Sequence, residues 1–430
     1  MTSIRFLKPA AAAFATSLLL LGISLGIAAA KDGKTQADLA VAKTAASATD
    51  VANPNWAAGW RAAPQAAGTN PVGAAGLNHQ TARMIVRSDA TGNKLRIRLS
   101  NAFGASPVVV AAVSVAYQQS GPTIDARSSR SVTFNGQPSV TIPVGQESVS
   151  DPVPLSVRRG QNLVVSAYFP AATGPSTWHF EAESTTYLSQ PGNWTSEPGG
   201  SPYQTITPSW YYLDGIDVYS HAAHGTIVAF GDSITDGHYS TIDANGRWPD
   251  WLARRIPQYS VINEGIGGNR VLTDTSSSGI SALHRFDTDA LNQPDVTGII
   301  VLEGINDIQS ADASAASVID GLQQLIARAH ARCIPIFGGT LTPFKGSNGY
   351  SADREQAREA VNAWIRTSGA FDGVVDFDKA VRDPADPLAL LPAYDSGGGH
   401  LHPNDLGYEA MGNAVSLSML KKHYSCDELR

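Results

Sequence analysis

The chain has 430 residues, of which 43% are hydrophobic, 16% charged and 8% aromatic. This composition is ordinary for a folded protein, and the length exceeds the roughly 250 to 300 residues at which single cores stop growing, so we expect two domains. Lys and Arg total 31 against 38 for Asp and Glu, giving a net charge of -7 without a basic stripe. A nucleic-acid partner is therefore not expected.

Residues 1–30 have the pattern of a secretory signal peptide. Arg5 and Lys8 precede an apolar run from Ala10 to about Gly26, and small residues at 28–30 offer a cleavage site. A membrane anchor is the alternative, but the run contains serines and glycines and falls short of the roughly 20 apolar residues of a span. We expect a secreted or periplasmic protein without stable membrane insertion, with residues 31–52 as a flexible lead-in.

Residues 53–220 show short alternating runs separated by Gly, Pro, Asn and Asp. This pattern is typical of antiparallel strands, and no long helical pattern intervenes. The sequence therefore predicts a β-sandwich accessory domain of the jelly-roll sort. The clearest expected strands are 82–87, 94–99, 108–117, 131–134, 155–157 and 163–169.

From residue 221 to residue 430, apolar strands alternate with helical patterns. Such alternation predicts a parallel, doubly wound sheet, whose reacting groups lie beyond the carboxyl ends of the strands. The expected strands are 226–230, 259–263, 298–302, 334–341 and 374–377. The expected helices are 248–256, 314–331, 353–367 and 404–423.

The first of these strands runs directly into Gly231-Asp232-Ser233. A serine at a strand-to-helix turn is expected to expose its hydroxyl beside backbone N–H groups that favour an anion. The ordinary alternative is a serine that caps the helix. Taken alone, the segment favours the capping role.

Glycines and an asparagine follow the next two strands. Gly267 and Gly268 follow the second, where backbone can approach a substrate and direct an N–H at a developing oxyanion. Asn306 follows the third and brings a side-chain amide to the same edge. Both segments are also ordinary turn sequences.

His402 lies in a short segment before the last helix, where Pro403 suits the first helical position. It is expected to project above the sheet as a general base. With His400 it could instead bind a metal, but no further cluster with ligand spacing accompanies the pair. We expect no metal and no cofactor.

Together these segments resemble the SGNH (GDSL) hydrolase family over roughly residues 224–423. The resemblance implies a flavodoxin-like, five-stranded parallel sheet with flanking helices. It also implies that Ser233 is the nucleophile, that His402 is its base, and that the Ser233 N–H, the Gly268 N–H and the Asn306 amide form an oxyanion hole. The preceding sandwich resembles a bacterial subgroup found among plant-polysaccharide acetylesterases.

One position departs from the family pattern. The family usually has an Asp three residues before the histidine, where this chain has Gly399. Asp395 could fold back into the role, a backbone carbonyl could orient His402 in a Ser-His dyad, or the site could be impaired. Asp232 and Asp307 are expected to brace their turns.

The expected function is an exported serine esterase that removes acetyl groups from carbohydrate or plant polysaccharide by an acyl-enzyme mechanism. Tyr239 and Trp248 are candidates for stacking on sugar rings, with core packing as the alternative. A lipase, arylesterase or thioesterase is the second hypothesis. A carbohydrate-binding protein with an impaired hydrolase site is the third. The oligomeric state is left open.

Cys333 and Cys426 are the two cysteines of the chain. In an exported protein they could form a disulfide that ties down the C-terminal tail, or they could remain independent thiols. The sequence leaves both alternatives open, because it does not give the separation of the two Cα atoms.

Overall fold

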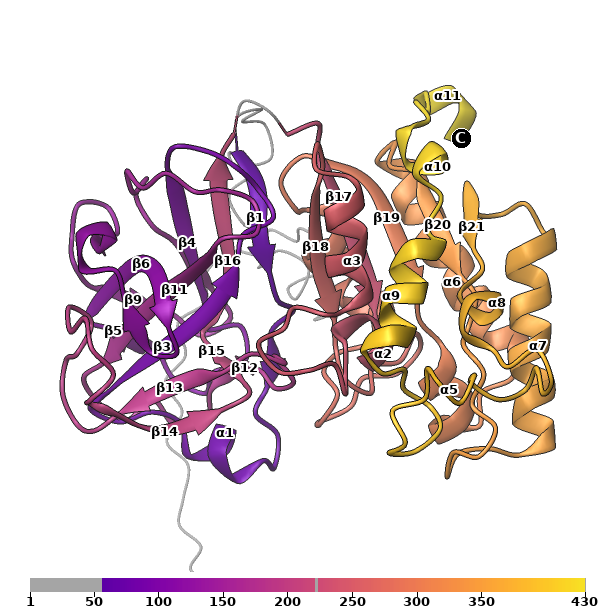
Figure 1. The fold of residues 1–430 in the computed structure, drawn as a ribbon, viewed down its shortest axis with the longest axis horizontal. Coiled ribbons are helices and arrows are strands. Elements are labelled where there is room, and N and C mark those ends of the chain that lie inside the picture. The colour runs from indigo at the N-terminus through magenta and orange to yellow at the C-terminus, as the bar shows by residue number, and fades with distance from the viewer. Residues whose placement is uncertain (1–55, 221–222, 430) are drawn as a thin grey trace, which may run out of the picture. The chain divides into compact units, whose positions relative to one another are not determined.

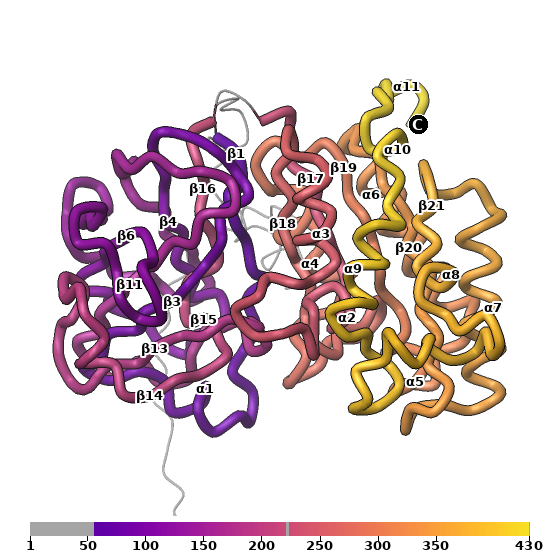
Figure 2. The backbone as a smooth tube through the Cα atoms, viewed as in Figure 1, coloured from indigo at the N-terminus to yellow at the C-terminus, as the bar shows by residue number. Residues whose placement is uncertain are grey.

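The computed structural model describes residues 56–220 and 223–429. The predicted signal peptide at 1–30 and lead-in at 31–52 lie outside the described residues. The described residues belong to one compact unit. Within it we call residues 56–220 the β half and residues 223–429 the α/β half. Figure 1 shows both as a ribbon, and Figure 2 traces the same backbone.

The β half is built from antiparallel strands, as the alternating pattern predicts. A four-stranded sheet has the order β1 (Trp56–Arg61), β16 (Leu213–Tyr219), β4 (Leu95–Ser100) and β10 (Glu147–Val149). The larger sheet has the order β14 (Tyr203–Thr207), β13 (Thr186–Ser189), β3 (Gln80–Arg87), β11 (Asn162–Phe169), β6 (Ala112–Ser120) and β7 (Thr123–Ile124), and β8 (Arg130–Val132) also pairs with β6. Smaller sheets join β15 (Trp210–Tyr211), β12 (Thr177–His179) and β2 (Gln65–Ala66), and β5 (Val108–Val110) with β9 (Val140–Ile142). Short helical turns occur at α1 (Pro71–Ala75) and η2 (Ala126–Ser128).

Two expected strands of the β half differ in the structure. The run 108–117 is divided at Ala111, because β5 pairs with β9 whereas β6 pairs with β11. The run 155–157 forms only an isolated bridge at Val157. Pro152 and Pro154 precede it, and a proline has no backbone N–H to donate to a ladder. Sheet changes of this kind depend on distant partners, which the local pattern does not contain.

The α/β half has the predicted parallel sheet. Its five strands lie in the order β18 (Ser260–Gly265), β17 (Thr226–Gly231), β19 (Val296–Leu302), β20 (Ile336–Gly339) and β21 (Gly373–Val375). Helices flank the sheet (Figure 1). They are α2 (Ser233–Asp236), α3 (Trp248–Arg255), α4 (Ala282–Phe286) with the π-helix η3 (Asp287–Leu291), α5 (Ile305–Ala311), α6 (Ala315–Ala331), α7 (Ala352–Thr367), α8 (Phe377–Val381), α9 (Asp405–Ala414), α10 (Leu417–Lys421) and α11 (Cys426–Leu429).

The predicted helices 248–256, 314–331 and 353–367 are present within a residue or two of the expected ends. The predicted helix 404–423 is interrupted between α9 and α10, where Val415 and Ser416 adopt extended backbone. The last strand is shorter than expected, because the Asp376 side chain accepts from the Lys379 N–H and begins α8. None of the described helices is long and apolar enough to cross a membrane.

The two halves share a buried boundary. Each half has its own main hydrophobic core, but Ala58 of β1 packs into the core around the parallel sheet. The Ser260 hydroxyl at the start of β18 donates to the Ala58 carbonyl. The first strand of the β half is therefore fixed directly to the edge strand of the α/β half.

The two cysteines form a disulfide in the structure. Cys333 and Cys426 have their Cα atoms 4.9 Å apart, within the range that a disulfide requires. The bridge joins the segment after α6 to the first residue of α11. Of the two alternatives left open by the sequence, the structure therefore shows the one that ties down the C-terminal tail.

Candidate active site

Ser233 is placed at the carboxyl end of the parallel sheet by β17 and α2. Asp232 precedes it as the N-cap, and its Oδ1 accepts from the Ile234 N–H at 2.9 Å. The capping role thus belongs to Asp232, which leaves the serine hydroxyl available. The residue as a whole is buried, with 6% of its surface exposed, and its hydroxyl forms a part-buried contact with His402.

The Ser233 hydroxyl forms a hydrogen bond with His402. Oγ and Nε2 lie 2.8 Å apart, although the two residues are 169 positions apart in the chain. His402 is held in its segment by Asn404, whose side chain caps α9 and donates to the carbonyls of Ala393 and Asp395. A serine and an imidazole at this distance are the arrangement in which a base can take the hydroxyl proton.

The environment of His402 favours the neutral imidazole. Burial, followed by the charge of His238, lowers its pKa to about 4, while the Glu181 carboxylate acts in the opposite direction. At neutral pH His402 therefore carries no excess proton. Nε2 is available to accept the proton of Ser233.

Two backbone N–H groups in the segments that follow β17 and β18 have no protein acceptor among the described residues. They are the N–H groups of Ser233 and Gly268. Gly268 has a φ of +73°, and a Cβ there would meet the Ser278 Oγ at 2.5 Å, so a side chain would be both strained and crowded. The glycine is required by the backbone geometry that presents this N–H.

Asn306 contributes a side-chain amide whose orientation is fixed. Its Oδ1 accepts from the Gln309 side chain at 3.0 Å, and its Nδ2 donates one hydrogen to the Asn269 carbonyl at 3.0 Å. An amide nitrogen has two hydrogens, so one remains for another acceptor. The amide therefore both braces the loop of Gly268 and retains a donor.

Sequence reasoning missed the buried Arg285, which fixes the geometry beneath the site. Its guanidinium donates to the carbonyls of Gly231 and Glu264 at 2.8 Å each and to the Asn269 side chain at 2.9 Å. It thus links the ends of β17 and β18 to the loop of Gly268. Asp307 completes the brace by accepting from two backbone N–H groups of that loop, as its expected structural role predicts.

Asp395 does not orient His402 in the structure, which corrects that prediction. Its Oδ2 lies 2.5 Å from Nδ1 of His400, and its Oδ1 accepts from the Gly397 N–H. In the part of the chain that is described, no hydrogen bond reaches Nδ1 of His402, either from a carboxylate or from a carbonyl. The geometry is that of a Ser-His pair, because the Gly-rich turn directs Asp395 to the nearer histidine.

The two aromatic candidates differ. Trp248 is completely buried and packs against Phe377 with ring centroids 5.1 Å apart, so the prediction that it stacks on substrate was wrong. Trp248 is the first residue of α3, and its side chain points into the core. Tyr239 is 48% exposed, and its ring centroid lies 5.7 Å from that of His402.

Two further residues that the sequence did not indicate lie beside His402. The His238 ring packs edge-to-face against it, with centroids 4.6 Å apart. Glu181, from the segment after β12 in the β half, has its Oε2 3.2 Å from Nδ1 of His238. No local motif signals these residues, because each is brought to His402 by contacts between segments far apart in the sequence.

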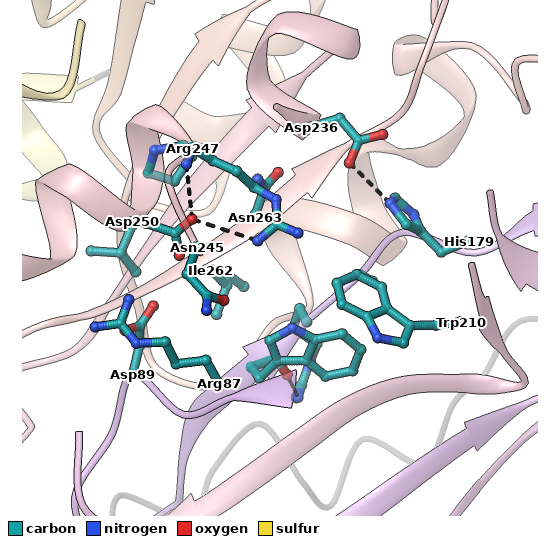
Figure 3. A pocket seen from close by; sticks show the side chains of 15 residues that line it. Arg87, Asp89, His179, Trp210, Asp236, Asn245, Arg247, Asp250, Ile262 and Asn263 are labelled. Carbon is teal, nitrogen blue, oxygen red and sulfur yellow. Dashed lines mark hydrogen bonds and ion pairs between the residues drawn. The ribbon is translucent and has the colours of Figure 1, made fainter. Parts of the chain in front are cut away.

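A small cavity lies between the halves near this region. It measures about 30 Å³ and is lined in part by His179, Asp236, Arg247 and Asp250, as Figure 3 shows. Ligand sites are typically ten times larger or more, and Ser233 is not among the lining residues. The cavity is a packing feature of the boundary. Nor does any group of three or more His, Cys, Asp or Glu among the described residues form a metal site.

Residues 229–410 match the GDSL-like Lipase/Acylhydrolase family. No curated protein matches the chain in sequence. Among solved structures, the chain is similar to a GDSL-like lipase from Bacteroides thetaiotaomicron VPI-5482, with 19% identity, a TM-score of 0.35, and coverage of 45% of this chain and 87% of that one. It is also similar to a member of the lipolytic protein G-D-S-L family from Veillonella parvula DSM 2008, with 22% identity, a TM-score of 0.33, and coverage of 44% and 94%.

A third similar structure is the native aryl esterase of M. smegmatis, with 14% identity, a TM-score of 0.37, and coverage of 44% of this chain and 95% of that one. These likenesses are too weak in identity and TM-score to support a conclusion, so the assignment rests on the family match. Residues 229–410 are therefore a domain of the GDSL-like lipase/acylhydrolase family, and the protein is a carboxylic ester hydrolase.

Proposed function

We propose that the protein is an exported serine esterase that removes acetyl groups from carbohydrate through a Ser233–His402 dyad. The observation that carries the catalytic part is the hydrogen bond of 2.8 Å between Ser233 Oγ and His402 Nε2. It satisfies the first requirement of acyl transfer, because a serine hydroxyl is a poor nucleophile until a base takes its proton.

The proposed reaction has two halves. Ser233 Oγ attacks the ester carbonyl while His402 takes its proton, and the N–H groups of Ser233 and Gly268 with the Asn306 amide receive the oxyanion. Collapse expels the alcohol, which takes the proton from His402 and leaves an acyl-serine. Water then attacks with the same base, releases the carboxylic acid and restores Ser233. Each oxyanion donor contributes roughly 3 to 4 kcal/mol.

The acetyl-carbohydrate specificity rests on the surroundings of the site. Tyr239 presents an exposed aromatic ring near His402, and such rings stack on sugars. The additional β half also favours a polymeric or oligomeric carbohydrate over a small lipid ester.

We further propose that residues 53–220 and 221–430 act as a jelly-roll-like accessory domain and a catalytic domain. The strand order β18-β17-β19-β20-β21 supports a flavodoxin-like arrangement of the latter. Export after removal of residues 1–30 is supported by the Cys333–Cys426 disulfide, since disulfides persist in oxidising compartments.

The decisive measurement is hydrolysis of a chromogenic acetate by purified protein and by Ser233→Ala and His402→Ala. Loss of a dyad member is expected to lower kcat by about 10⁴ or more. Retention of more than about a tenth of the rate in either variant contradicts the assignment. Unchanged circular dichroism and melting temperature provide the control for folding.

Specificity is measured with p-nitrophenyl esters of rising chain length and with acetylated xylan and oligosaccharides. A lipase gains roughly 0.8 kcal/mol for each methylene that it buries, so its kcat/KM rises from acetate to octanoate. We expect preference for acetate over butyrate and longer chains. A rising series identifies a lipase, and binding of oligosaccharide without turnover of any ester identifies a carbohydrate-binding protein.

A further inference from the structure

We propose that Glu181 and His238 are positioning residues of the active site, in which Glu181 of the β half anchors His238 and His238 holds the His402 imidazole toward Ser233. The β half then supplies part of the reaction machinery. This inference rests on the proposed function, in which His402 is the general base.

The first observation is the packing of the His402 ring. Ser233 lies against one of its nitrogens, and the His238 ring crosses it at an interplanar angle of 74°. The His238 backbone is itself fixed, because its N–H donates to the Ser233 carbonyl and its carbonyl accepts from the Tyr408 hydroxyl at 2.7 Å. His238 therefore restricts rotation of an imidazole for which the described residues supply no carboxylate partner.

The second observation is how the β half reaches His238. The Glu181 Oε2 lies 3.2 Å from Nδ1 of His238, and the Glu183 Oε1 lies 3.7 Å from the same atom. Two residues before Glu181, His179 Nε2 lies 2.9 Å from the Asp236 carboxylate at the end of α2. The segment 179–183 thus contacts both the helix that begins at Ser233 and His238, which lies two residues past the end of that helix.

Gly267 provides a third, independent observation. A Cβ at this position would lie 2.4 Å from the Glu181 Oε2, whereas the backbone of Gly267 is not in the left-handed region. A side chain at this position would therefore displace the Glu181 carboxylate from where it lies, whereas it would not strain the backbone. Glu181 is packed between the loop that presents the Gly268 N–H and the His238 ring.

The charges are consistent with this arrangement. Burial opposes a charge on His238, but Glu181, Glu183 and Asp236 outweigh it and raise its pKa. Burial also opposes ionisation of Glu181, but His238, His402 and His179 lower its pKa. Burial raises the pKa of Glu183 to about 7, which leaves Glu181 as the principal anion.

His402 faces the His238 and Tyr239 rings. Glu181 favours the protonated form of His238, and the His238 ring lies against the His402 ring. The cation disfavours a second proton on the neighbouring imidazole. His238 thus both restrains His402 and keeps it available as a base.

The test measures kcat, KM and the pH profile of kcat/KM for acetate hydrolysis in His238→Gln, Glu181→Gln and the double variant. We expect kcat to fall about tenfold or more in each single variant with KM changed less than threefold, because a displacement of 1 Å can cost about a hundredfold. Glu181 acts through His238, so the double variant should be less than twofold slower than His238→Gln. In His238→Gln the fall of kcat/KM at low pH should also move to higher pH, because the charge of His238 lowers the pKa of His402. We call this fall the acidic limb.

Matched controls are His79→Gln and Glu197→Gln, whose side chains contact Tyr168 and the Gly199 N–H within the β half. Both should retain wild-type kinetics. A further variant, Gly267→Ala, displaces the Glu181 carboxylate without removing it and should lower kcat in the same direction. It provides a second test if Glu181→Gln proves unstable.

Three outcomes would overturn the proposal. The first is a kcat within threefold of wild type in both single variants. The second is an acidic limb of kcat/KM that does not move in His238→Gln. The third is a double variant in which the two single losses of kcat multiply. Failure of the proposed function is distinguishable, since it appears as activity retained in Ser233→Ala.

Discussion

The orientation of one amide illustrates how much of the chemistry depends on single residues. Asn306→Ala removes the proposed oxyanion donor and also the hydrogen bond to the Asn269 carbonyl. We expect kcat to fall by about 10² to 10³ with little change in KM, since the lost interaction develops in the transition state. Steady-state kinetics on a chromogenic acetate test this expectation, with Gln309→Ala as a milder variant that only frees the amide to rotate. An unchanged kcat would make Asn306 a turn residue.

The low pKa of His402 predicts activity in acid. The base must be neutral, and burial with the nearby His238 charge lowers its pKa to about 4. Activity is therefore present above that pH and lost only as the pH falls through it. The acidic limb of kcat/KM should have its midpoint below pH 5.5, where an ordinary histidine would give a value near 6.5. A midpoint at or above 6.5 contradicts this environment.

At this scale the sequence indicates the candidates whose proposed role is local. Ser233, Gly268, Asn306 and His402 each follow a strand or precede a helix, and the structure brings Ser233 and His402 into hydrogen-bond contact. Arg285, His238 and Glu181 have no such signal, because their partners lie on other elements and in the other half. Trp248 is the opposite case, a residue that the sequence indicates and the structure excludes. The sequence does not show whether an aromatic side chain near a motif faces solvent or the core.

The turn before α9 that carries Asp395 and Gly399 determines whether a carboxylate reaches His402. Asp395 contacts His400, so Asp395→Asn should change kcat by less than threefold. Gly399 is not in the left-handed region, and a Cβ there meets nothing within 4 Å, so Gly399→Asp should fold with an unchanged melting temperature. If its carboxylate reaches His402, kcat should rise, because an acid stabilises the imidazolium.

Kinetics and thermal melts of the two variants check this pair of expectations. His400→Gln is the control, since it removes the partner of Asp395 without touching the dyad. A loss of several orders of magnitude in Asp395→Asn would mean that the aspartate turns to His402 during the reaction. The dyad assignment would then be wrong.

Whole elements are predicted well where periodicity is long and poorly where the chain changes partners. The helices 314–331 and 353–367 carry apolar residues through four turns, and the structure has them as α6 and α7. The short helices α4, α5 and α8 escape prediction because one or two turns contain too few repeats. The division of 108–117 into β5 and β6 reflects pairing with different strands, which is non-local information.

At the scale of the molecule, the contact between His179 and Asp236 joins the halves. Both ring nitrogens of His179 face acceptors, Asp236 Oδ1 at 2.9 Å and the Ala63 carbonyl at 2.8 Å. Burial opposes charge on His179, but Asp236 and the Ala63 carbonyl raise its pKa. Burial raises the pKa of Asp236 as well, so the pair as a whole retains a proton more strongly than a free histidine.

The sign of the pH dependence follows. A pair that holds its proton more tightly when folded contributes stability below the unfolded histidine pKa of about 6.5, and loses it as the pH rises through the folded value. His179→Gln should therefore lower the melting temperature more at pH 6 than at pH 9.5. Calorimetry at both values is the measurement, with the exposed His284→Gln as control. An equal difference at the two pH values would show that the contact is not linked to protonation.

The pairing of β1 with β16 has a consequence for how the protein is made. The strand β1 pairs with β16, which begins at Leu213, and it also packs along β18. Of these two neighbours, β16 is the last strand of the β half to be synthesised, and β18 follows it in the α/β half. A chain emerging N-terminus first carries β1 without partners until those segments appear. Long-range antiparallel closure of this kind is slow and leaves strand edges open to aggregation. The capture of unpaired β1 by holdase chaperones, rather than final stability, should therefore limit the yield of active enzyme.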